Sequence, residues 1–76
     1  MGDDEIGKDL VECHSGYEYA ERPTALQWEG RRLEVEAVEA QWRAPGGRGF
    51  RVRTSEGLKF ELFYAELYDE WRIHPI

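Results

Sequence analysis

From Tyr17 onward, large apolar side chains recur at every second position, which is the spacing of a β-strand with one buried face. The alternation is clearest over residues 50–54 and 58–64, where apolar and polar residues take turns. A helix would need apolar residues at intervals of three and four to form one stripe. The alternation therefore predicts a mostly β fold.

Two neighbouring hairpins can be aligned by register, so that apolar side chains meet inside and opposite charges meet outside. For the first hairpin the predicted pairs are Trp42–Phe50, Ala40–Val52 and Val38–Thr54 inside, with Gln41–Arg51 and Glu39–Arg53 outside. For the second they are Val52–Phe60 and Phe50–Leu62 inside, with Arg51–Glu61 outside. The agreement of the two alignments favours an antiparallel sheet.

Turns and a bend separate these strands. Glu29-Gly30 and Ser55-Glu56-Gly57 predict tight turns in which glycine takes a positive φ, and residues 45–49 predict a glycine-rich loop. The apolar parity changes near Ala37–Val38, which indicates a β-bulge and a strongly bent strand. Strong bending is typical of small barrels.

Residues 60–71 also fit a helix, because Phe60, Tyr64, Leu67 and Trp71 are spaced by four, three and four. The register favours a strand over 58–64, with a helical turn over 65–70. If the whole stretch is a helix, the sheet has three or four strands and one C-terminal helix covers it.

The expected fold is a mostly β antiparallel meander of about five strands that forms a small, strongly bent, partly open barrel. A chain of 76 residues makes one domain. We expect residues 1–12 to be a flexible acidic tail and residues 13–76 to be the β domain, with a short first strand at Tyr17–Tyr19 and a last one at Trp71–Ile73.

The net charge of −6 is concentrated near the N-terminus, since residues 1–20 hold six acidic residues and one lysine. This acidity argues against avid nucleic-acid binding, although a local arginine patch stays compatible with it. The single cysteine, Cys13, excludes an internal disulfide, and with no secretory signal or long apolar run we expect a cytoplasmic protein without membrane contact.

Arginines lie close to tryptophans in the middle of the chain, which is typical of a platform for single-stranded nucleic acid. The competing interpretation is that Arg51 and Arg53 pair with glutamates across the sheet and that the tryptophans belong to the core. The candidate binding residues are Trp28, Trp42, Arg43, Arg48, Arg51 and Arg53.

Phosphate binding, metal binding and nucleophilic catalysis have weaker support in the sequence. The loop over 45–49 matches no phosphate-binding fingerprint, and Cys13, His14 and His74 lack the paired spacing of zinc ligands. Adjacent residues on a strand point to opposite faces, so Cys13 and His14 make a poor nucleophile and base. We therefore expect no catalytic residues, no metal and no cofactor.

Short motifs run from Glu21-Arg22-Pro23 through Trp28, Gly30, Trp42, residues 50–54, Gly57 and residues 60–62 to Trp71 and His74. Together they resemble a family of small bacterial domains of unknown function. The resemblance implies no activity and no site residues. This chain departs from the pattern by a longer Ala65–Glu70 segment before Trp71.

The expected function is that of a non-enzymatic binding module for a protein or single-stranded nucleic-acid partner, since small β-barrels commonly bind and no reactive constellation stands out. The alternatives are a small structural or homodimerising protein and, last, a metal protein or enzyme that uses its histidines and cysteine. A monomer and a homodimer are both compatible with the sequence.

Overall fold

The computed structural model describes residues 4–13 and 22–76, which form seven antiparallel strands in one sheet of order β1-β7-β6-β5-β4-β3-β2. The strands are β1 (Glu5–Gly7), β2 (Val11–Cys13), β3 (Pro23–Trp28), β4 (Arg31–Ala44), β5 (Gly47–Thr54), β6 (Lys59–Ala65) and β7 (Glu70–Pro75). The predicted mostly β, antiparallel fold is confirmed, with seven strands in place of five. The strand predicted at Tyr17–Tyr19 lies outside the described residues.

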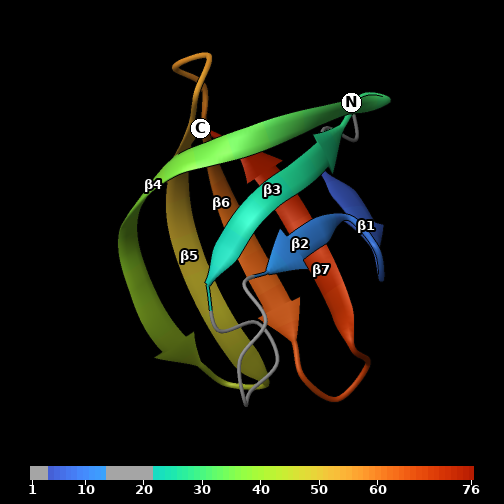
Figure 1. The fold of residues 1–76 in the computed structure, drawn as a ribbon. Helices are drawn as coiled ribbons and strands as arrows, with labels where there is room; N and C mark the ends of the chain where they lie inside the picture. Colours follow the sequence, from blue (N-terminus) through green and yellow to red (C-terminus); the bar gives the residue numbers. More distant parts are fainter. Residues whose placement is uncertain (1–3, 14–21) are drawn as a thin grey trace.

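The sheet curls into a partly open barrel (Figure 1). Strands β1 and β2 follow each other in the chain but stand at opposite ends of the sheet order, so the two edges must approach each other. One hydrogen bond connects β1 to the β3–β4 turn across this closure: the Glu29 N–H donates to the Glu5 carboxylate at 2.9 Å. On the β2 side, the Gln27 N–H donates to the Leu10 carbonyl at 2.7 Å, which extends the pairing of β2 with β3. No helix in the described part of the chain is long and apolar enough to cross a membrane.

The N-terminal segment differs from the flexible tail expected over residues 1–12. Glu5 pairs with Ile73 and Gly7 with Trp71, while Val11 pairs with Leu26 and is buried. The segment has few apolar residues of its own, so its order comes from the two strand edges whose backbone groups it satisfies.

Strand β4 carries the predicted bend, which is confirmed near Ala37–Val38 and consists of two bulges in place of one (Figure 1). The register with β5 shifts across Glu36 and again across Glu39. Both extra carboxylates approach Arg53, at 3.7 Å and 2.9 Å. The bend lets residues 31–34 pair with β3 while the rest of β4 pairs with β5.

The two hairpins differ in how well their registers were predicted. The β5–β6 pairs, including Arg51 opposite Glu61, are confirmed, and Gly57 has the expected positive φ of 87°. The β4–β5 register is wrong by one residue or more, because Trp42 lies opposite Gly49. The predicted loop over 45–49 is only a two-residue turn, with Gly46 at φ 85°, and β5 begins at Gly47.

The structure of residues 60–71 contradicts the alternative prediction of a helix. Strand β6 confirms the predicted strand, and both the helix over 60–71 and the helical turn over 65–70 are wrong. Residues 66–69 form a turn that ends on Asp69, whose φ is 54°. The Tyr64 hydroxyl donates to the Asp69 carboxylate at 2.7 Å, and this bond fixes the turn against the core.

The core fills the inner face of the curled sheet. Its most completely buried large side chains come from β3, β5, β6 and β7: Leu26, Phe50, Val52, Phe60, Leu62 and Ile73. Each such side chain stabilises the fold by about 1.5–3 kcal/mol relative to an exposed one. Since alternate residues point outward, the same strands also present a solvent-facing surface, which we call the outer face.

Candidate functional surfaces

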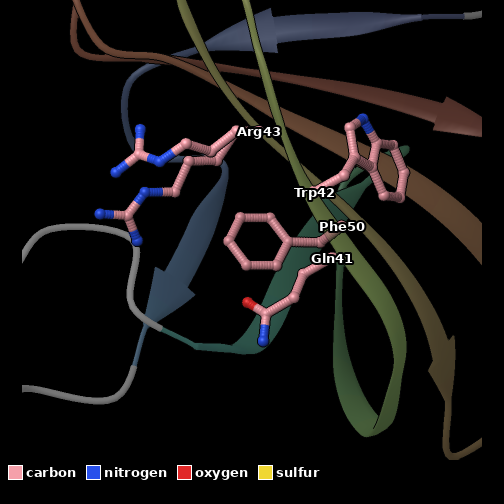
Figure 2. Close-up of a pocket in the computed structure, with 5 residues that line it drawn as sticks. Gln41, Trp42, Arg43 and Phe50 are labelled. Atoms are coloured by element: carbon pink, nitrogen blue, oxygen red, sulfur yellow. The ribbon is translucent and has the colours of Figure 1, made fainter.

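The predicted binding residues do not gather on one face. Figure 2 shows Arg43 and Gln41 on the side of β4 where Phe50 lies, while the indole of Trp42 points the other way. Arg43 lies opposite Arg48, and Gln41 opposite Phe50, so these side chains belong to the inner face at the open end of the barrel. Trp42 belongs to the outer face.

The open end holds a hollow of about 330 Å³ lined by Gln41, Trp42, Arg43, Arg48 and Phe50. Glu66 approaches both arginines, at 3.9 Å from Arg43 and 3.7 Å from Arg48. The Glu66 N–H donates to the Gly46 carbonyl at 2.9 Å, which places this carboxylate beside the β4–β5 turn. The charges of the two arginines are thus partly compensated within the protein.

Arg51 and Arg53 lie on the outer face, each beside a carboxylate. Arg51 is 3.0 Å from Glu61, and Arg53 is 2.9 Å from Glu39. Both pairs were predicted from the sequence and are confirmed as ion pairs, although Arg53 stands opposite Ala37 in the register because Glu39 is a bulge residue. These arginines help to hold neighbouring strands together.

The two candidate tryptophans have different environments. Trp28 packs against Phe60 with ring centroids 5.2 Å apart and adjoins the core. Trp42 is 40% exposed and covers Gly49, where an added Cβ would lie 2.2 Å from its ring. Of these two tryptophans, Trp42 is the exposed one.

One row of residues crosses five strands on the outer face, and we call it the outer row. Consecutive register pairs connect its members: Trp42 with Gly49, Gly49 with Phe63, Phe63 with Arg72, and Arg72 with Ile6. Ile6 is 59% exposed and Phe63 is half-buried. The row is thus an apolar strip that contains one guanidinium group.

Two hollows flank the Phe63–Arg72 pair. One, of about 420 Å³, reaches the β6–β7 turn and is lined by Ile6, Pro45, Gly46, Phe63, Ala65, Leu67, Tyr68, Glu70, Trp71 and Arg72. The other, of about 310 Å³, is lined by Asp4, Trp42, Glu61, Leu62, Phe63, Arg72 and His74. Leu67 and Tyr68, which are 83% and 66% exposed, extend the apolar surface beyond the row.

Arg72 differs from the other arginines of the strands. Those at 31, 32, 43, 48, 51 and 53 each lie within 4 Å of a carboxylate. For Arg72, no described residue forms such an ion pair, and its side chain lines both hollows. An exposed guanidinium beside two hollows is suited to pairing with an external anion.

The cysteine and histidines give no reactive site among residues 4–13 and 22–76. Burial raises the pKa of the Cys13 thiol to about 11, so the thiolate that metals and electrophiles require is disfavoured. The His74 Nδ1 lies 2.7 Å from the Asp4 carboxylate. No group of three potential ligands that could hold a metal ion occurs in these residues, and His14 lies outside them.

Sequence reasoning missed Ile6, Phe63, Leu67, Tyr68 and Arg72. Phe63 and Arg72 have the parity opposite to the core residues Leu62 and Trp71, so the alternation that predicted the strands also placed them outward. The arginines that lie near tryptophans in the sequence instead have carboxylates of neighbouring elements beside them. No family model, curated protein or solved structure matches this chain, so the resemblance to a bacterial family of unknown function stays a prediction.

Proposed function

We propose that the protein is a non-enzymatic binding module whose outer face docks a segment of a partner protein. The outer row carries this proposal, because it aligns Trp42, Phe63 and Ile6 on the solvent side of a sheet whose core lies on the other side. Contiguous apolar surface on a small protein commonly marks an interaction site. Aromatic residues and arginine are also the types enriched where interfaces derive most of their affinity.

A protein partner fits the charge distribution better than a nucleic acid does. The four predicted arginines, at 43, 48, 51 and 53, each lie beside a carboxylate, and the hollows of the outer face include Asp4, Glu61 and Glu70 in their linings. A strand of successive phosphates would meet these carboxylates. The net charge of −6 adds a general repulsion.

The test is a selection of random twelve-residue peptides displayed against the full chain. Selected peptides are titrated into isotope-labelled protein, and we expect amide shifts centred on Phe63, Arg72 and Tyr68. Leu67→Ser and Tyr68→Ser should each weaken binding about tenfold or more, as for residues that dominate an interface. Both side chains are largely exposed, so these variants should still fold.

Leu58→Ser is the matched control, because Leu58 is an exposed leucine in the β5–β6 turn, outside both hollows. It should leave binding unchanged. Peptides that map to another surface, or that bind equally to the Leu67→Ser and Leu58→Ser variants, would contradict the proposal.

A homodimerising protein is the second candidate, supported by one edge of β4. From Ala37 to Ala44 this strand pairs with β5 on one side, and no strand of the described residues pairs with the other side. Such an edge can accept another strand. Light scattering that gives one chain mass of 8.9 kDa across micromolar to millimolar concentrations would remove this candidate.

A further inference from the structure

We infer that the docked segment carries a carboxylate between apolar side chains, and that Arg72 binds this carboxylate. This inference rests on the proposed function and adds the chemistry of the partner. Its basis is that Arg72 is the charged residue of the outer row, lies between Phe63 and Ile6, and lines both of the hollows beside that row.

The position of Arg72 sets the order of groups in the partner. One hollow extends from Phe63 toward Leu67 and Tyr68, and the other extends from Phe63 toward Trp42. Arg72 contributes to the linings of both, and its register neighbours are Phe63 and Ile6, so an anion bound to it has apolar side chains on either side. The matching segment is an Asp or Glu residue with large apolar residues on either side, or a C-terminal carboxylate preceded by one.

The charge of Arg72 selects for an anion over a neutral group. Among the described residues no carboxylate is within ion-pairing distance of it, so a bound carboxylate does not have to break an existing ion pair. A guanidinium can hold a carboxylate through two parallel N–H···O bonds. Asp4, Glu61 and Glu70 line the hollows, and their repulsion grows with the charge of the ligand, so one carboxylate is opposed less than a chain of phosphates.

The test compares two small probes of similar size and shape, one charged and one neutral. 3-Phenylpropionate joins a phenyl ring to a carboxylate, and 3-phenylpropionamide is its neutral counterpart. Each is titrated into the isotope-labelled full chain, with the amides of Ile6, Phe63 and Arg72 as readouts. We expect the acid to bind about three- to fivefold more tightly than the amide, the advantage of one exposed ion pair.

Arg72→Gln should remove this difference without removing the binding of the amide. Arg31→Gln is the matched control, since it deletes an equal charge at an exposed arginine that lines neither hollow, and it should leave the difference intact. Arg72→Glu should reverse the preference, so that 3-phenylpropylamine binds more tightly than the acid. The reversal also shows that this variant is folded.

The outcomes separate the two proposals. Equal binding of acid and amide on the outer face overturns the Arg72 inference and leaves the proposed function standing. Binding of the acid at Arg43 and Arg48 instead overturns the inference as well. Absence of outer-face shifts with either probe counts against both proposals. Shifts on this face with single-stranded oligothymidylate that fade with salt would replace the protein partner by a nucleic acid.

Discussion

Gly47 and Gly49 occupy two positions on the outer face where any side chain would meet a neighbour, but the neighbours differ. A Cβ on Gly47 would lie 1.8 Å from the Tyr64 carbonyl oxygen, which belongs to the adjacent strand and cannot move alone. A Cβ on Gly49 would meet the Trp42 indole, which is partly exposed and can swing outward. Aromatic rings often cover glycines of a sheet in this way.

We therefore expect Gly47→Ala to lower the free energy of unfolding by about 3 kcal/mol and Gly49→Ala by about 1 kcal/mol. Urea titration followed by circular dichroism measures both. Gly7→Ala is the control, because its new Cβ would meet only the flexible Leu10 side chain at 3.3 Å, and its effect should stay within about 0.5 kcal/mol. Equal losses of unfolding free energy for Gly47→Ala and Gly49→Ala would show that the Trp42 indole does not move outward.

The Tyr64–Asp69 hydrogen bond gives a second prediction for single residues. Tyr64→Phe should cost about 1 kcal/mol, the usual net value of one hydrogen bond. Asp69→Ala should cost about 2 kcal/mol, because it also places alanine at a positive φ of 54°. Asp69→Asn keeps an acceptor and tolerates that φ, so its thermal unfolding midpoint should stay near that of the wild type. A large loss for asparagine would contradict this account.

Strand β2 is a three-residue edge strand that an ion pair ties to the sheet. The Glu12 carboxylate accepts hydrogen bonds from Arg32 at 2.8 Å and 3.0 Å, across the intervening β3. These bonds lower the pKa of Glu12 below its ordinary value. A lowered folded-state pKa means that the stabilisation is complete above the unfolded pKa and is lost as pH falls through the folded one.

Glu12→Gln should therefore lower the thermal midpoint at pH 7, and the difference from the wild type should shrink as the pH falls below the ordinary pKa of a glutamate. Scanning calorimetry at several pH values checks this. Asp9→Asn is the control, because Asp9 is an exposed acid of the same segment, and it should produce no such pH-dependent difference. If the difference in thermal midpoint between the wild type and Glu12→Gln persists at low pH, packing of the side chain and not its charge would explain the destabilisation.

The strands show why sequence predicted some pairings and missed others. The β5–β6 register was predictable because Gly57 marks its turn and both strands alternate without interruption. The β4–β5 register was not, because the Pro45-Gly46 turn is shorter than the run of loop-forming residues, and bulges at Glu36 and Glu39 each shift the pairing. A glutamate in a bulge resembles any outward-facing glutamate in the sequence.

Across the whole molecule, pairing between distant segments determines strands and surfaces that the local sequence does not predict. Residues 5–7 have no strong strand preference, and β1 exists because β7 offers it an edge. The same holds for the outer face. The sequence does not show which arginines have a carboxylate beside them, and the fold alone distinguishes Arg72 from the arginines at 43, 48, 51 and 53. The fold class thus follows from alternation, whereas the site depends on which strands become neighbours.

The role of the N-terminal segment can be tested on the entire chain. Replacing residues 4–8 by glycine and serine at equal length should lower the free energy of unfolding by about 2 kcal/mol or more. The cause is the loss of the β1–β7 pairs and of the Asp4–His74 contact at 2.7 Å. Unchanged urea midpoints would restore the interpretation of this segment as a tail. Replacing only the exposed Lys8 by serine should have little effect.

The pairing of β1 with β7 also bears on how the chain is made. During synthesis, Glu5 cannot meet Ile73 until β7 itself has been translated. Strand β1 therefore waits without its partner while the strands between the two are made. Contacts between such distant positions slow folding, so the sheet of a nascent chain stays open on this side until β7 is released.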